Sequence, residues 1–453
     1  MLPDDVLLKV FDFYVEQDMV QIFEKTRIEE WITLAHVCRR WRSVVFQSPR
    51  RLNLRLLCTS KTRVRDSLDI WPPLPLAIHA VDGERPGLYN IIAALEHNDR
   101  VCQIKLATQS SELEYFMHKS FPELTHLLIG MYNYDGGMPK IPDSFLGGTA
   151  PRLRSLRLGG VPFPGLPNLL LSTTHLVHLD VHFIPRTGYI PPEAITNSLS
   201  GLTSLEYLRL EFRYPRPRPV IDSRRSPPPT RSILPRLTKI LFQGVSDYLE
   251  EMLTRIDTPQ LEELCIGFFH QSIFDTPQLL QFISRRPTLR APERGHIEFH
   301  SQHIIIKFSS QTSHYDVLSV RIGSMPSERQ LSSLKQVCAS SLPPLSTLED
   351  LYISEDPQWR SRWQGSFENT LWLELLHLFA TVKNLYLAKE FVPRIAPNLQ
   401  ELVGGRATEV LPSLMNILLE GFQPPGPLHE GIERFVAARL LTGHPVAVSR
   451  WEL

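Results

Sequence analysis

The residue types that could do chemistry are all present, but their spacing forms no recognised catalytic motif. The 453 residues contain no G-x-x-x-x-G-K-S/T phosphate loop, no G-x-G-x-x-G and no G-x-S-x-G. The segment HIEFH places His296 and His300 around Glu298, without the H-E-x-x-H order of zinc proteases. Its alternation predicts a strand with these three side chains on one face, as ordinary surface polar positions. We therefore predict a protein with no catalytic residues, no metal site and no cofactor.

Cysteine usage and the N-terminus indicate a reducing compartment. The five cysteines are far apart and never form a C-x-x-C pair, so neither a disulfide framework nor a zinc ribbon is predicted. The start, MLPDDVLLKV, is acidic where a secretory signal would be basic, and no apolar run approaches the roughly 18 residues that span a bilayer. The sequence predicts a protein of the cytoplasm or the nucleus, without membrane attachment.

The composition favours a large folded core made of short elements. Apolar residues make up 42% of the chain, which excludes global disorder. Lys+Arg and Asp+Glu number 48 each, so there is no basic field to capture nucleic acid or an anionic membrane. The 38 prolines against 23 glycines favour many short elements joined by stiff turns.

From residue 51 onward the chain repeats one pattern, in which apolar residues stand at positions i, i+3 and i+5. The first seven copies begin at residues 101, 124, 153, 176, 205, 237 and 261, which are 23 to 32 residues apart, and two later copies begin at residues 348 and 382. Leucine-rich repeats have periods of 20–29 residues and place L-x-x-L-x-L on a strand. A single unit cannot bury its apolar face, whereas stacked units can.

Segments between these copies start with polar residues or proline and then show helical spacing, which predicts alternating strands and helices. The predicted fold class is therefore an α/β solenoid, an irregular leucine-rich-repeat horseshoe. We expect irregularity because the asparagine or cysteine that usually follows the strand is missing from most copies. Between residues 261 and 348 the sequence predicts extra strands that form a hairpin, instead of clean repeats.

Residues 211–236 are rich in proline and arginine and predict a flexible insertion between two repeats. A polyproline ligand or a loop regulated by phosphorylation at Ser226 is the alternative.

On the strand pattern, positions i+2, i+4 and i+6 lie on the face opposite the core and are candidates for contacting a target protein. Tyrosine and arginine are frequent at binding hot spots. The candidates are His126, Arg157, His178, Asp180, His182, Tyr207, Arg209, Tyr352 and Tyr386.

The first 48 residues show helical spacing, and their order of residues resembles an F-box. LPDDVLLKVFDFY followed by LAHVCRRWRSVVFQSPRRL matches the pattern L-P-x-E/D-x-L-x-x-I-F, then V-C-R-x-W and a closing S-P. The rest of the chain is similar to the leucine-rich receptors of the expanded F-box family of mushroom-forming fungi. The expected organisation is an all-helical F-box at 1–50 and an irregular repeat solenoid at 51–453.

The resemblance implies the substrate-recognition subunit of a cullin–RING (SCF-type) ubiquitin ligase. The F-box would dock on a Skp-type adaptor, and through it on the cullin and RING subunits, while the repeats hold an unknown target protein. The resemblance assigns adaptor contacts or helix packing to Leu2, Pro3, Val6, Leu7, Val10, Phe11, Leu34, Val37, Cys38 and Trp41.

The apolar positions of this short helical segment exceed what its own helices could cover, which indicates a partner, packing on the first strands at residues 51–80, or both. Two other functions stay open: a leucine-rich-repeat scaffold with no ubiquitin-ligase role, and an enzyme whose site no motif reveals.

Overall fold

The computed structural model describes residues 2–16, 34, 36–47, 54–70, 73–80, 87–108, 118–131, 140–215, 231–269, 274–310, 315–323, 327–340, 342, 345–355, 369–402, 404–421 and 429–451. The chain forms two compact units, unit 1 (Met1–Leu205) and unit 2 (Glu206–Leu453). The predicted boundary after residue 50 stays a prediction.

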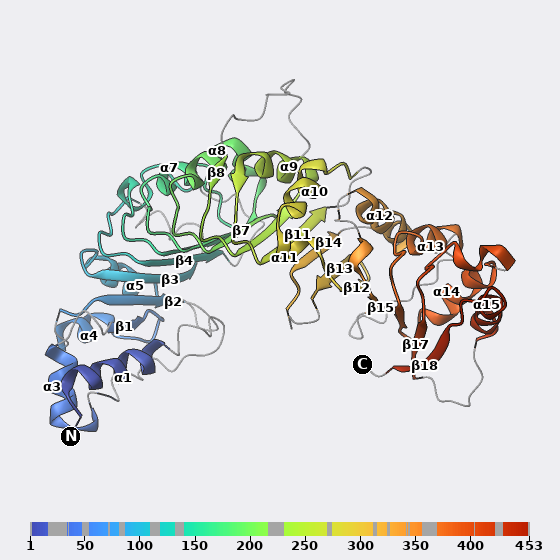
Figure 1. Cartoon of the computed structure of the whole chain (residues 1–453). Helices are drawn as coiled ribbons and strands as arrows, with labels where there is room; N and C mark the ends of the chain where they lie inside the picture. Colours follow the sequence, from blue (N-terminus) through green and yellow to red (C-terminus); the bar gives the residue numbers. More distant parts are fainter. Residues whose placement is uncertain are drawn as a thin grey trace. The chain divides into compact units, whose positions relative to one another are not determined.

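Unit 1 begins with two helices, and a sheet of parallel strands follows them (Figure 1). Each strand pairs in parallel with the next in the chain, from β1 to β6. The helices are α1 (Asp4–Glu16), α3 (Arg39–Gln47), α4 (Val64–Ile70), α5 (Leu88–Leu95), α7 (Leu166–Leu170) and α8 (Pro192–Leu199). The strands are β1 (Leu54–Leu57), β2 (Leu76–Ala80), β3 (Val101–Thr108), β4 (His126–Met131), β5 (Ser155–Gly159) and β6 (His178–Ile184).

Unit 2 contains a mostly parallel sheet in the order β7-β9-β11-β14-β13-β12-β15-β16-β17-β18, and a small parallel pair, β8 with β10. Its strands are β7 (Tyr207–Phe212), β8 (Ser232–Ile233), β9 (Lys239–Gly244), β10 (Ile256–Asp257), β11 (Glu263–Phe269), β12 (Arg294–Phe299), β13 (Ile304–Ser309), β14 (Leu318–Gly323), β15 (Asp350–Glu355), β16 (Asn384–Leu387), β17 (Asn416–Glu420) and β18 (Ala447–Trp451). Its helices are α9 (Ser246–Arg255), α10 (Pro277–Ser284), α11 (Pro287–Arg290), α12 (Ser327–Ser340), α13 (Asn369–Leu376), α14 (Val392–Gln400) and α15 (Glu430–Leu441).

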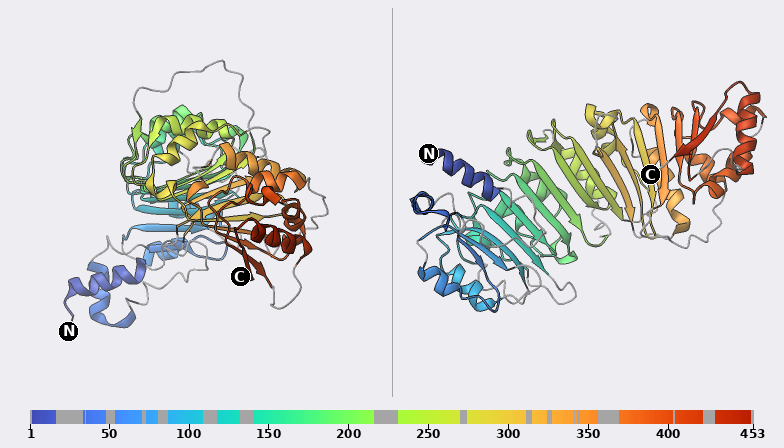
Figure 2. Two further views of the ribbon diagram at one scale, coloured as in Figure 1. Left: turned by 45° about the vertical axis from the view of Figure 1, so that its right-hand side comes forward. Right: turned by 90° about the horizontal axis from the view of Figure 1, so that it is seen from below.

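The helices between strands lie on one side of the sheet and pack on their neighbours: α7 on α8, α9 on α10, and α12 to α15 in order (Figure 2). The predicted alternation of strands and helices in the repeat region is confirmed, with helices at α8, α9, α10, α12 and α13. Within each unit the architecture is therefore that of an α/β solenoid, as the sequence predicts. None of the helices in the described part of the chain has the length and apolar content to cross a bilayer.

The i/i+3/i+5 pattern builds the core. In all nine copies the three apolar side chains are at most 3% exposed. Equivalent positions pair across neighbouring strands, as in Leu127 with Leu156 and Leu156 with Leu179. Because side chains alternate along a strand, this register places every i+3 and i+5 residue on the helix side and every i+2 and i+4 residue on the other side. We call that other side the strand face.

Backbone hydrogen bonds join neighbouring repeats where the strands begin. At the start of β5, β6, β9, β11, β15, β16 and β17, two successive N–H groups donate to one carbonyl of the neighbouring repeat. The N–H groups of Arg154 and Ser155 donate to the Thr125 carbonyl at 2.8 and 3.1 Å, and those of Lys383 and Asn384 donate to the Glu349 carbonyl at 2.8 and 3.0 Å. These strand entries are thus joined by groups that every residue other than proline carries.

The predicted hairpin between residues 261 and 348 is confirmed, and it reverses the local strand order. β12 and β13 pair antiparallel, as do β13 and β14, so β14 lies beside β11 and β12 beside β15. In β12 the register places Gly295 opposite Leu351, at the i+3 position. A Cβ there would lie 3.3 Å from Leu348 Cδ2, so the glycine makes room for the leucine of the next repeat. This strand is a repeat position that the apolar pattern cannot reveal.

The described ends of the predicted 211–236 insertion belong to the fold. Glu211 and Phe212 are part of β7, and Phe212 is buried against Phe242 and Tyr248. Leu234 is fully buried after β8. Residues 216–230, including Ser226, lie outside the described residues.

Candidate functional site

The two N-terminal helices pack through a small apolar core. Leu7 and Phe11 of α1 and Val44 and Val45 of α3 are buried, and the Phe11 ring meets Trp41 edge-on with centroids 4.9 Å apart. Such an aromatic pair stabilises a contact by about 1 kcal/mol beyond its buried area. These residues hold the two helices together.

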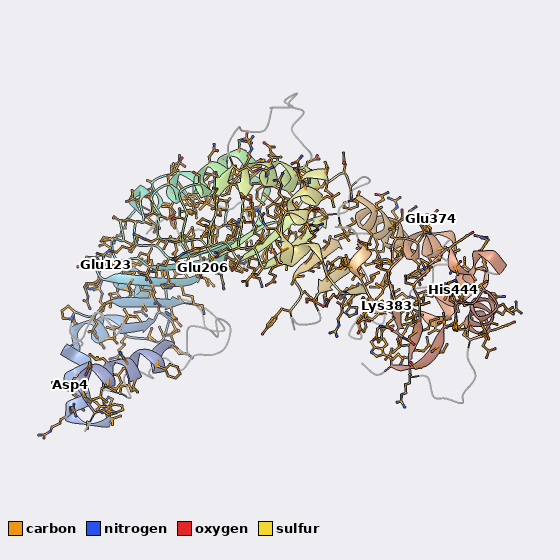
Figure 3. The ribbon with its side chains drawn as sticks, viewed as in Figure 1. Asp4, Glu123, Glu206, Glu374, Lys383 and His444 are labelled. Atoms are coloured by element: carbon orange, nitrogen blue, oxygen red, sulfur yellow. The ribbon has the colours of Figure 1, made fainter. Side chains whose placement is uncertain are left out.

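Arg40 ties the start of α1 to α3. Its Nη2 donates to the Leu2 carbonyl at 2.5 Å and to Asp4 Oδ1 at 2.6 Å, and its Nε reaches the same carboxylate at 3.1 Å. Asp4, labelled in Figure 3, lies in the first helical turn, where a carboxylate is also favoured by the helix dipole. The sequence prediction missed Arg40, since its only signal is a basic pair, Arg39 and Arg40.

The predicted adaptor-contact residues divide into a packing set and an exposed set. Leu7, Phe11 and Leu34 are buried, and Val6 and Trp41 are half-buried. The exposed set comprises Leu2 at 54%, Val10 at 46%, Val37 at 59%, Pro3 and Cys38. Phe13, which is 65% exposed, was missed, although its spacing from Val6 and Val10 (i, i+4, i+7) is that of one helix face.

On the strand face of unit 1, four predicted residues form a cluster: Arg157 and His182 contact the buried carboxylate of Asp180, and His178 contacts Arg157. Asp180 is 1% exposed. Its Oδ2 accepts from Arg157 Nε at 2.9 Å, and its Oδ1 accepts from His182 Nδ1 at 2.8 Å. Arg157 Nη2 also donates to His178 Nε2 at 3.2 Å. Because arginine only donates, this His178 nitrogen carries no proton.

Gly159 and His126 lie next to this cluster on the strand face. The His182 ring leans over Gly159 of the adjacent strand, where a Cβ would lie 2.7 Å from His182 Nε2. His126, the fifth predicted residue of this face, is half-buried beside Thr125, whose Oγ1 is 2.9 Å from Nδ1. Burial lowers the pKa of His126, so this imidazole is neutral near pH 7.

On the strand face of unit 2, the predicted Tyr207 and Arg209 are half-buried, and Arg209 Nη2 donates to Glu211 Oε2 at 2.9 Å. Next to them, Lys239 of β9 pairs with Glu263 of β11 at 2.7 Å. This part of the face is a set of matched opposite charges.

Farther along unit 2, aromatic rings replace the ion pairs. Tyr352 and Tyr386 stack with centroids 4.0 Å apart and planes 13° apart. Trp451 of β18 meets both rings at 5.7 and 5.6 Å. We call these three residues the aromatic patch; all three are half-buried. The sequence prediction missed Trp451, because β18 lacks the i/i+3/i+5 pattern that identified β15 and β16.

A polar ladder runs beside the aromatic patch, at the entry of the same strands. Asn384 Nδ2 donates to Asp350 Oδ1, and Asn416 Nδ2 donates to Asn384 Oδ1, both at 2.7 Å. Arg294 Nε approaches the other Asp350 oxygen at 3.5 Å. Lys383, labelled in Figure 3, pairs with Glu349 at 2.6 Å just before these strands. The ladder joins β15, β16 and β17, and two of these strands carry Tyr352 and Tyr386. Asp350 and Asn384 stand at the i+2 position of the copies that begin at residues 348 and 382, which places them on the strand face.

The described residues offer little for cysteine or metal chemistry. Burial raises the pKa of Cys58, Cys102 and Cys265 to about 12, so these thiols are protonated at neutral pH and poor nucleophiles. All five cysteines are unpaired. No group of three or more His, Cys, Asp or Glu residues that could hold a metal ion occurs in the described part of the chain. Glu298 of the HIEFH segment instead accepts a hydrogen bond from Lys307 Nζ at 2.7 Å.

Comparisons with known proteins show no family for this chain. No protein-family model matches the chain, and no curated protein matches it. Among solved structures, the chain is similar to the crystal structure of the leucine-rich repeat-containing protein LegL7 from Legionella pneumophila, with 12% identity over 87% of this chain and 99% of that chain. The TM-score is 0.29, and a similarity of that size supports no conclusion about fold or function.

Proposed function

We propose that this protein is a substrate-recognition subunit of an SCF-type ubiquitin ligase. In this proposal α1 and α3 belong to an F-box that docks on a Skp-type adaptor, and the strand face of an irregular leucine-rich-repeat horseshoe holds the target protein. The protein itself performs no catalysis. It raises the effective concentration of the target near the ubiquitin carrier.

One observation carries the proposal: Leu2, Val10 and Val37 are about half exposed or more, while their neighbours Leu7 and Phe11 are buried. The buried pair accounts for the packing of the helices. The exposed residues are positions that the F-box pattern assigns to the adaptor or to helix packing, and a docked adaptor would cover their apolar side chains.

The strand face supports the receptor role. Its half-buried tyrosines, arginines and histidines are side chains that contribute strongly to protein interfaces. They are held by ion pairs and stacking, as between Arg157 and Asp180 or Tyr352 and Tyr386, so less side-chain entropy is lost on binding.

The test is binding of the purified full chain to an immobilised Skp-type adaptor–cullin complex, measured by biolayer interferometry. We expect binding at micromolar concentration or tighter, and roughly tenfold weaker binding for Val10→Asp and for Val37→Asp, because each places a charge in an apolar interface. Leu441→Asp is the matched control, since Leu441 is 88% exposed in unit 2. Its affinity and the thermal midpoints of all variants should equal those of the wild type.

A wild-type chain that does not retain the adaptor at micromolar concentration would refute the ligase role. The scaffold function would then be favoured, because the strand face does not depend on the first helices for its contacts.

A further inference from the structure

The aromatic patch of unit 2 lies on a part of the strand face with an unusual charge composition. The strand-face positions of β15 to β18 include Asp350 at one end of the aromatic rings and Glu420 at the other. Glu420 is directly opposite Trp451 in the strand register. None of the described residues that these four strands contribute to this face is basic. Arg294 of the neighbouring strand β12 approaches Asp350, and the backbone N–H of Lys389 donates to Glu420 Oε2 at 3.2 Å.

The rings of the aromatic patch form one row on the strand face. Tyr352 and Tyr386 form a parallel stack, and Trp451 meets Tyr386 at 72° and Tyr352 at 60°. His296 continues the row on β12, with its ring centroid 6.0 Å from that of Tyr352. The row is rigid, since His296 Nε2 lies 2.6 Å from Ser354 Oγ and the Asn384 ladder fixes the strands.

We propose that the aromatic patch binds an arginine side chain of an extended segment of the target protein. This inference rests on the proposed function, because it names the chemistry of the target that the receptor holds. Aromatic faces attract cations through the ring quadrupole, and the planar guanidinium also stacks on them. Glu420 supplies complementary charge at one end of the patch, and Asp350, which is buried and approached by Arg294, lies at the other end.

Arginine fits these observations better than the alternatives. A lysine ammonium is a strongly hydrated point charge, and it gains less from a stacked pair of rings. An acidic segment would meet two carboxylates, with no basic side chain from these four strands on the same face. A proline-rich segment could stack on the rings but would leave the carboxylates without a function.

The experiment uses the full chain and a neutral glycine–serine peptide that contains one central arginine. Ligand-observed saturation-transfer NMR detects weak binding and reports which peptide protons touch the protein. We expect saturation of the arginine side-chain protons, and at least about fivefold weaker binding for the same peptide with citrulline, which is nearly isosteric but uncharged. Lysine in that position should also bind more weakly.

Single variants distinguish the contribution of the aromatic rings to peptide binding from that of the carboxylates. We expect Tyr386→Leu and Trp451→Leu to weaken arginine-peptide binding about fivefold or more, and Glu420→Gln to weaken it about threefold and to reduce its salt dependence. Glu420→Gln changes charge with little change of shape, so it tests the inference even if a ring variant unfolds. Tyr89→Leu is the control, because Tyr89 is an exposed tyrosine of unit 1.

Equal binding of the arginine and citrulline peptides, or binding unaffected by both Tyr386→Leu and Glu420→Gln, would overturn the inference. Preferential binding of a proline-rich peptide would also overturn it. Adaptor binding is measured on the same preparations. Loss of peptide selectivity with intact adaptor binding refutes only the arginine site, and loss of adaptor binding with intact peptide selectivity refutes only the ligase role.

Discussion

Asn416 donates its side-chain amide to Oδ1 of Asn384 at 2.7 Å, and so continues a ladder that begins at Asp350. Each member of this ladder comes from a different strand, and each occupies the same i+2 position. Asn384 is its centre, because it both donates to Asp350 and accepts from Asn416. The ladder is the side-chain counterpart of the backbone bonds at the strand entries.

We expect Asn384→Ala to destabilise the chain by about 1–3 kcal/mol, because it removes two hydrogen bonds and leaves a carboxylate oxygen and an amide without those partners. Urea unfolding followed by circular dichroism measures the loss. Asn416→Ala removes one bond at the end of the ladder and should have about half the effect. Equal losses for the two variants would contradict a continuous ladder.

Arg439 of α15 is 1% exposed, and its guanidinium donates to three backbone carbonyls, those of Ala407, Pro412 and Leu414, at 3.3, 3.2 and 2.9 Å. Arg439→Met would keep the apolar stem but leave these carbonyls unsatisfied. We expect a loss of about 3 kcal/mol and a lower thermal midpoint.

The control for Arg439 is on the same helix. Arg434 is exposed and pairs with Glu430, and a surface pair of this kind contributes less than about 1 kcal/mol. Arg434→Met should therefore unfold at nearly the wild-type temperature. A similar midpoint for both variants would mean that the carbonyl contacts of Arg439 contribute little.

The lowered pKa values of His126 and His296 predict that the folded chain is less stable at acidic pH. Burial lowers the pKa of both His126 and His296, so the folded chain takes up their protons at lower pH than the unfolded chain, in which the pKa is about 6.5. Since the unfolded state then binds more protons, stability falls as the pH drops below about 6.5 and continues to fall until the folded-state pKa values are passed. Urea midpoints at pH 7.5 and 5.5 measure this loss.

The double variant His126→Gln/His296→Gln should have a clearly smaller loss of stability between these two pH values than the wild type. An unchanged loss would show that other groups cause it.

The spacing between Gly159 and His182 predicts the effect of adding one methyl group. In Gly159→Ala the new Cβ would lie 2.7 Å from His182 Nε2, so the ring must move away from Asp180. We expect a destabilisation of about 1–3 kcal/mol by urea unfolding.

Gly130 is the matched control for this change, because it lies in the same cross-strand row and a Cβ there has no atom within 4 Å. Gly130→Ala should be nearly neutral. In the double variant Gly159→Ala/His182→Ala the methyl group should no longer be costly, since its obstacle is gone. A large loss for Gly130→Ala, or no relief in the double variant, would contradict the steric explanation.

Much of the repeat architecture follows from local pattern. Leu156 and Leu158 are buried because their spacing puts both on one side of a strand, and the copies before and after them repeat that spacing. Where a strand lacks the apolar i/i+3/i+5 pattern, the sequence does not predict which of its residues lie in the core or on the strand face. Gly295 occupies a core position without an apolar side chain, and Trp451 lies on a strand whose other residues are mostly exposed. The F-box resemblance and the residues assigned through it stay predictions.

The sequence by itself determined which residues alternate between the core and the strand face, because a side-chain period of two and a repeat of 23 to 32 residues are properties of the chain alone. Only the tertiary structure decided which of those face residues meet. The contact of Arg157 with Asp180 and the contact of Tyr352 with Trp451 depend on strand order and register. Strand order and register come from the packing of distant segments, including the reversed β12–β14 insertion, and no local spacing encodes them.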